Sequence, residues 1–177
     1  MSKNNKNIYT INISTLKLGK QSFHFDIQKE FFDNFAPDLI QDASVQIEVQ
    51  ITKTTQHLDT QFHIKGSLQL NCDRCLNPYW QPIQATIPVI YSFNSHLKDS
   101  DNDEVIYLSR ETRMLDLSQE IYDFIALQIP QRKVPTDCPS PNCPPEILKM
   151  IQQNTEEIPT KVEIDPRWEK LKKITLN

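Results

Sequence analysis

Apolar and polar residues alternate through much of residues 9–109, with the period of two that is typical of half-buried β-strands. The clearest run is residues 45–52, where Val45, Ile47, Val49 and Ile51 alternate with polar side chains. Further strands are predicted at residues 9–13, 22–27, 61–70, 85–93 and 105–109. The first two should form a hairpin, and the runs at 45–52 and 61–70 should pair, with a bulge or a close backbone approach at Gly66.

Helical spacing of apolar residues predicts two helices that pack on this sheet. Phe31, Phe32 and Phe35 precede Pro37 and predict a short helix, whose rings either plug an open end of the sheet or form an exposed patch for a partner. A longer helix should open at residues 115–120, with Asp116 as its N-cap, and end at Pro130. Its apolar stripe should face the sheet and consists of Leu117, Ile121, Phe124 and Ile125.

Prolines are dense from residue 130 onward, which predicts an extended segment followed by short helices at residues 146–152 and near residue 165. A chain of 177 residues suffices for one domain with a real core, but not for two full-sized domains. We therefore predict an α+β domain dominated by an antiparallel meander sheet, either open or curled into a partial barrel. Residues 8–130 should form the sheet and its packed helix. Residues 131–177 should form a proline-rich, cysteine-containing C-terminal arm of the same domain, with short helices.

Composition removes several classes of function. The chain has 2 glycines, and neither belongs to a Gly-rich phosphate-binding loop. A net charge of −4 argues against a protein that coats nucleic acid through its overall electrostatic field. Binding of nucleic acid through a local basic patch is still open. The polar N-terminus lacks the apolar segment of a signal peptide, and no apolar run is long enough to span a bilayer. We expect a cytoplasmic protein, in which permanent disulfides are rare.

Four cysteines form two pairs that stand far apart in the sequence. Two residues separate Cys72 from Cys75, and four residues separate Cys138 from Cys143. Thiolates at these spacings can converge on one tetrahedral zinc ion, which would tie the C-terminal arm to the sheet. Two alternatives are open. The cysteines could stay reduced without a metal, or Cys72 and Cys75 could perform thiol exchange, although the βαβ context of thiol-redox proteins is missing.

Other candidate binding residues are weaker on pattern alone. A basic tail could contact phosphate or an acidic partner through Arg167, Lys170, Lys172 and Lys173. An acidic loop at residues 98–104 could equally receive a basic protein. His57 and His63 share a polar strand face, where we expect solvated side chains rather than metal ligands. Tyr79 and Trp80 should pack against the first cysteine pair, with base stacking as the alternative.

In their order and spacing, several of these features resemble the YceD family, a bacterial and plastid family linked to the accumulation of large-subunit ribosomal RNA. They are Cys72-Asp-Arg-Cys75-Leu before a β-run, the helix from Leu115 to Pro130, the second cysteine segment and Asp165-Pro-Arg-Trp168. The resemblance covers roughly residues 10–175. Many relatives carry a fuller cysteine-rich segment with glycines, whereas this chain keeps only Cys138 and Cys143. Some relatives lack the second pair altogether, so the resemblance implies that the fold in general does not require a metal.

The resemblance implies a non-catalytic ribosome-biogenesis factor, which binds a precursor of large-subunit rRNA or an assembling ribosomal protein of that subunit. The residues themselves show no catalytic constellation, and we expect no enzymatic activity, no membrane partner and no small-molecule substrate. Two alternatives belong to other classes. One is a thiol-redox protein that uses Cys72 and Cys75, and the other is a zinc-stabilised protein-interaction module unrelated to ribosomes.

Overall fold

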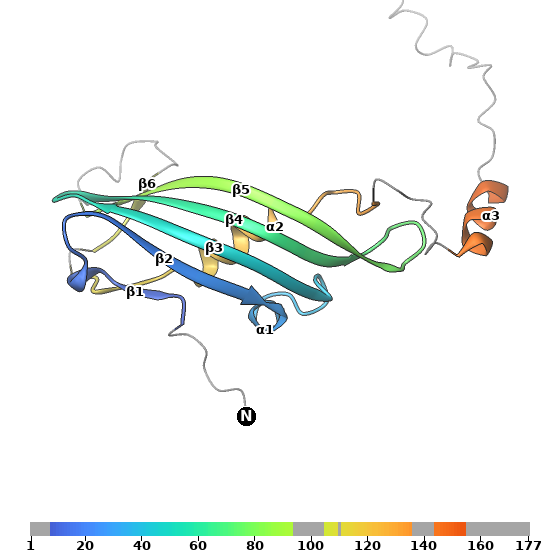
Figure 1. The fold of residues 1–177 in the computed structure, drawn as a ribbon, viewed down its shortest axis with the longest axis horizontal. Coiled ribbons are helices and arrows are strands. Elements are labelled where there is room, and N and C mark those ends of the chain that lie inside the picture. Colours follow the sequence, from blue (N-terminus) through green and yellow to red (C-terminus); the bar gives the residue numbers. More distant parts are fainter. Residues whose placement is uncertain (1–7, 94–104, 110, 136–143, 155–177) are drawn as a thin grey trace, which may run out of the picture.

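The computed structural model describes residues 8–93, 105–109, 111–135 and 144–154, and its main layer is a five-stranded sheet (Figure 1). The strands follow the order β2-β3-β4-β5-β6. They are β2 (Gly19–Gln28), β3 (Asp42–Lys53), β4 (His57–Asn71), β5 (Pro78–Ser92) and β6 (Val105–Tyr107). β2 to β5 form an antiparallel meander, and β6 joins β5 in parallel. The predicted α+β fold with a mainly antiparallel sheet is confirmed. The sheet is open, so curling into a barrel is not part of the fold.

Strict alternation gives this sheet one apolar and one polar face. In β3 the odd-numbered residues from Ala43 to Ile51 are buried, and the even-numbered residues lie on the opposite side. We call this opposite side the polar face; it carries the even-numbered residues of β2, β3 and β5 and the odd-numbered residues of β4. Gly66 stays in register opposite Val45, so no bulge forms there. A Cβ atom at Gly66 would lie 2.6 Å from Val45 Cα, which confirms the close backbone approach.

The predicted hairpin between residues 9–13 and 22–27 is wrong. β1 (Thr10–Asn12) instead pairs antiparallel with β7 (Met114–Asp116), in a separate two-stranded sheet. The physical reason is that alternation within a strand does not specify the partner, and a helical turn redirects the chain directly after β1.

This turn is the short 3-10 helix η1 (Ile13–Thr15), which the alternating pattern did not predict. Lys53 Nζ holds it at the end of β3, by donating to the carbonyl oxygens of Ile13 and Leu16 at 2.9 and 3.0 Å. These two bonds give the carbonyl groups at the two ends of this turn a hydrogen-bond donor from β3. The chain therefore passes below the sheet edge before it enters β2 (Figure 1).

Helix α2 (Ser118–Ala126) lies on the apolar face of the sheet (Figure 1). The predicted stripe is confirmed, since Leu117, Ile121 and Ile125 are buried and Phe124 meets Phe62 of β4 with ring centroids 5.0 Å apart. The predicted N-cap is wrong, because Asp116 ends strand β7 and the helix begins two residues later. The Asp116 carboxylate still accepts a hydrogen bond from Ser118 N at 3.0 Å.

The short helix α1 (Lys29–Phe32) confirms the prediction of aromatic core residues. Phe31 and Phe32 are buried, and Phe35 stacks on Tyr122 of α2 with ring centroids 4.5 Å apart. These rings close one end of the space between the sheet and α2. The alternative of an exposed aromatic patch for a partner is therefore wrong.

Helix α3 (Pro145–Asn154) confirms the helix predicted at residues 146–152. The helix predicted near residue 165 and the acidic loop at residues 98–104 both lie outside the described residues. Within the described ranges, no helix combines the length and apolar character needed to cross a membrane.

Candidate functional site

The connection between β4 and β5, residues 72–77, is a tight turn that we call the knuckle. Cys72 N donates to the carbonyl oxygen of Asn77, and Leu76 N donates to that of Cys72, both at 2.9 Å. Leu76 adopts the left-handed conformation, with φ of 60°, which lets the chain reverse within these few residues. Arg74 N donates to Cys72 Sγ at 3.4 Å. A donor at this position stabilises the thiolate form of a cysteine.

Both knuckle cysteines are buried, with exposed fractions of 1% for Cys72 and 3% for Cys75. They form a small apolar cluster with Tyr79, Val134 and Ile147. Val134 comes shortly before residues 136–143, and Ile147 comes shortly after them. The chain therefore leaves the knuckle and returns to it across the segment that carries Cys138 and Cys143, which itself lies outside the described residues.

A second link, which sequence reasoning missed, ties the arm to the knuckle. Asp73 N donates to the carbonyl oxygen of Lys133 at 2.8 Å, and Lys133 N donates to Asp73 Oδ2 at 2.7 Å. The Lys133 ammonium also lies 3.7 Å from Asp73 Oδ1. This reciprocal pairing fixes the start of the arm beside the cysteines. No pattern in the sequence pointed to it, because both residues lie in irregular segments.

The knuckle fits half of a structural zinc site. Two buried sulfurs and an amide donor to sulfur suit thiolate ligands. Tyr79 Oη is also buried and has no hydrogen-bond partner in the part of the chain that the structure describes. Burial, followed by the charges of Cys72 and Asp73, raises the pKa of Tyr79, which keeps its hydroxyl available as a donor beside the cysteines. Residues 8–93, 105–109, 111–135 and 144–154 contain no group of three or more metal-ligating side chains, so a complete zinc site at the knuckle would need ligands from outside these ranges, where Cys138 and Cys143 lie.

The geometry gives less support to thiol exchange at Cys72 and Cys75. Reactive cysteines of that class are partly exposed and often sit at a helix N-terminus, where the thiolate can attack a substrate disulfide. Here both sulfurs are buried, and the motif connects two antiparallel strands. An incoming disulfide would have to displace the packed side chains of Val134 and Ile147.

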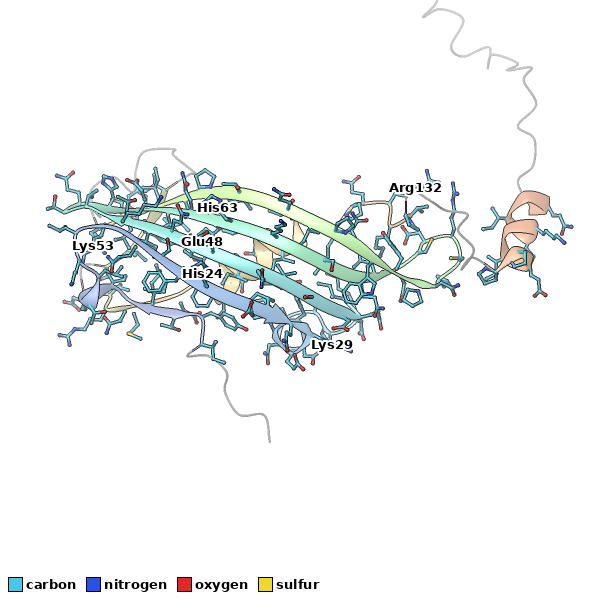
Figure 2. All side chains as sticks on the ribbon, viewed as in Figure 1. His24, Lys29, Glu48, Lys53, His63 and Arg132 are labelled. Atoms are coloured by element: carbon cyan, nitrogen blue, oxygen red, sulfur yellow. The ribbon has the colours of Figure 1, made fainter. Side chains whose placement is uncertain are left out.

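The polar face of the sheet carries a cluster of polar side chains that is separate from the knuckle. His24, Glu48, His63 and Thr86 stand in one register row across β2, β3, β4 and β5. Figure 2 shows the first three in a line across the strands. They line a hollow of about 530 Å³. Sequence alternation placed these residues outward, but only the strand register brings them together.

Hydrogen bonds hold the row in place. His63 Nδ1 lies 3.1 Å from Thr86 Oγ1, and Gln50 Nε2 donates to Glu48 Oε1 at 2.9 Å. The bond from Gln50 is the main cause that lowers the pKa of Glu48, and the imidazoles of His24 and His63 act in the same direction. The Glu48 carboxylate is therefore ionised at neutral pH, and one of its oxygens already accepts a hydrogen bond. Such a row can bind polar groups.

The remaining predicted residues are placed as follows. His63 belongs to this row, whereas His57 lies at the start of β4, with its Nε2 3.2 Å from Asp59 Oδ2. Trp80 is exposed on the polar face, so the predicted packing against the cysteines holds for Tyr79 only. The basic tail lies outside the described residues; its predicted binding residues are Arg167, Lys170, Lys172 and Lys173.

Comparison with known proteins identifies the family. No curated protein and no solved structure matches the chain. A family model described as large ribosomal RNA subunit accumulation protein YceD matches residues 60–175, which include most of β4, all of β5, the knuckle, α2 and both cysteine pairs. That match covers more than half of the 177 residues. The chain therefore belongs to the YceD family of large ribosomal RNA subunit accumulation proteins.

Proposed function

We propose that this chain is a non-catalytic, cytoplasmic factor in the biogenesis of the large ribosomal subunit, and that it acts by binding a precursor of large-subunit rRNA. Family membership is the observation that carries the proposal, because the family is named for accumulation of this RNA. Accumulation can be sustained by a bound protein that shields a precursor or guides its assembly. Neither role needs a chemical step by the protein.

The electrostatics of the described residues support binding of polar groups at the open surface. Burial is the main cause that raises the pKa values of Tyr91 and Glu120. They meet between β5 and α2, with Tyr91 Oη donating to Glu120 Oε1 at 3.5 Å. The hollow on the polar face instead holds Glu48, whose pKa is lowered. A carboxylate held in its charged form suits the binding of polar groups better than proton transfer at neutral pH.

The proposal includes one structural zinc ion, bound by Cys72, Cys75, Cys138 and Cys143. Its support is the buried first pair and the return of the chain to the knuckle on both sides of the second pair. When bound, zinc would supply a rigid cross-link and no chemistry. The residues of this chain would then do the positioning: the Asp73–Lys133 pair fixes the start of the arm, and Ile147 fixes α3 beside the cysteines.

Depletion of the protein in cells tests the function. The level of large-subunit rRNA should fall relative to that of small-subunit rRNA, and it should recover when the wild-type chain is supplied. Crosslinking in cells should recover precursors of the large-subunit rRNA on the protein. An unchanged rRNA ratio would refute the role in biogenesis. A changed ratio with crosslinks to a ribosomal protein alone would keep that role and refute direct RNA binding.

A further inference from the structure

Trp80 is an exposed aromatic residue on a face that is mostly polar. It lies on β5 opposite Gln69, and 47% of its surface is exposed. Its nearest neighbours on the same side of β5 are Pro78 and Pro82, whose short rings cannot reach over an indole. Large aromatic side chains usually bury most of their surface. An indole that stays open between two prolines is therefore suited to receive a flat partner.

Cations surround the knuckle, although the whole chain is acidic. Trp80 is two residues from the start of β5 and three residues from Asn77, the last residue of the knuckle, which is about 10 Å along the strand. The knuckle, residues 131–135 and α3 contain four cations, Arg74, Arg132, Lys133 and Lys149, against two acids, Asp73 and Glu146. The local charge is therefore +2, compared with −4 for the whole chain. Figure 2 places Arg132 at the knuckle end of the sheet, and it is exposed there.

Some of this local charge is already neutralised. Lys133 pairs with Asp73, which leaves Arg74, Arg132 and Lys149 as the cations that can meet a partner. Asp42 is the acid in the same row as Trp80, and it lies two strands away, about 10 Å.

Further positive charge follows α3 in the sequence, beyond the described residues. α3 ends at Asn154 and contacts the knuckle through Ile147. Residues 166–177 contain four cations and one acid, Glu169. These twelve residues therefore carry a net charge of +3.

We infer that the knuckle end of the polar face is the RNA-binding surface, where Trp80 stacks on an unpaired base of large-subunit rRNA and Arg74 and Arg132 neutralise adjacent phosphates. An aromatic platform bordered by guanidinium groups is the usual means of holding single-stranded RNA. A basic ribosomal protein would favour an acidic surface instead. This inference rests on the proposed function and names the site through which it operates.

Tryptophan fluorescence tests the stacking directly. The chain has 2 tryptophans, so Trp168→Phe leaves Trp80 as the only tryptophan, and excitation that is selective for indole then reports on Trp80 alone. Titration of this variant with a single-stranded fragment of large-subunit rRNA should quench the emission of Trp80 in a saturable manner. Trp80→Ala should weaken binding by about 5- to 150-fold, the range measured for loss of one base–aromatic stack. Trp80→Phe should restore part of the affinity, because a ring remains.

Salt titrations test the two arginines. Arg74→Ala and Arg132→Ala should each reduce the slope of log affinity against log salt by about 0.7, the value for one phosphate contact on a single strand. Lys20→Ala is the matched control, since Lys20 is an exposed cation near the start of β2 and pairs with Thr52 at the far end of β3. It should leave the slope unchanged. Circular dichroism should show that all variants keep the wild-type fold.

The outcomes separate this inference from the proposed function. RNA binding without quenching of Trp80, and with full affinity in Trp80→Ala, would overturn the surface and leave RNA binding intact. Equal slopes for the arginine variants and Lys20→Ala would also overturn it. Failure of the wild-type chain to bind large-subunit rRNA fragments at low salt would overturn direct RNA binding, and the surface with it.

Discussion

Asp73 and Lys133 bind each other through both main chain and side chain, although 60 residues separate them in the sequence. The pair joins the knuckle, which ends the longest strand pairing of the sheet, to the first residues of the C-terminal arm. Its side chains are partly exposed, so the ion pair itself contributes little. The two hydrogen bonds that the backbone amides of Asp73 and Lys133 donate determine where the arm begins.

Replacing Asp73 should therefore loosen the arm without unfolding the sheet. Asp73→Ala removes the acceptor of Lys133 N and should lower the free energy of unfolding by about 1 kcal/mol. Amide exchange at Lys133 N–H should accelerate in the same variant. Asp73→Asn keeps an acceptor oxygen and should restore most of the protection. Unchanged exchange at Lys133 in Asp73→Ala would show that other contacts hold the arm.

Gly66 should tolerate no side chain. A Cβ atom there would meet the carbonyl oxygen of Ser44 and lie 2.6 Å from Val45 Cα, and both are backbone atoms that cannot rotate away. Gly66→Ala should thus force β3 and β4 apart and lower the free energy of unfolding by about 2 kcal/mol or more. Ser67→Ala, one residue along on the polar face, is the control and should cost much less. Urea denaturation of both variants measures the difference, and equal midpoints would contradict the close approach.

Glu120 should make the protein less stable as the pH rises. Burial is the main cause that raises its pKa, and Asp116 and Asp123 add to it. The contribution of Glu120 to stability is complete below its ordinary pKa of 4.5, and it is lost as the pH rises through the higher folded-state pKa.

A neutral replacement tests this pH dependence. Glu120→Gln keeps an acceptor for Tyr91 Oη and should be more stable than wild type at neutral pH, with a flatter profile above pH 4.5. Glu111→Gln, an exposed carboxylate outside the core, should leave the profile unchanged. Urea midpoints measured from pH 4 to pH 8 give the comparison. Parallel profiles for wild type and Glu120→Gln would refute the role of this carboxyl group.

Periodicity predicted the strands of this fold because burial on one face is a local property. Apolar and polar residues alternate from Val45 to Ile51 regardless of which strand lies beside β3. The apolar stripe of α2 is likewise set by the spacing of its own residues. Partners are a non-local property, which is why β1 was paired wrongly with β2. β7 has 3 residues, too few to show any period, so its pairing with β1 left no signal in the sequence.

The candidate site also combines local features, which the sequence predicts, with non-local contacts, which it does not. The Cys72-x-x-Cys75 spacing marks the knuckle in the sequence because both cysteines lie within four consecutive residues. The His24–Glu48–His63 row depends on the register of three strands, and a shift by one residue would remove it. The Asp73–Lys133 pair joins two irregular segments, where single charged residues are ordinary surface features. Trp80 was expected to pack, and only its place on the polar face shows why it is exposed.

The zinc proposal predicts a metal content and a thiol reactivity that metal-free packing of the cysteines would not give. Purified protein should contain about one zinc per chain, and its four thiols should react only after chelation. Cys72→Ser and Cys138→Ser should each lower stability by several kcal/mol, and the double variant should be no worse than either, because either loss destroys the same site. Ser67→Ala is a control that should retain zinc. Four freely reacting thiols without metal, or additive effects of the two cysteine variants, would refute the site and leave the Asp73–Lys133 pair as the link between arm and sheet.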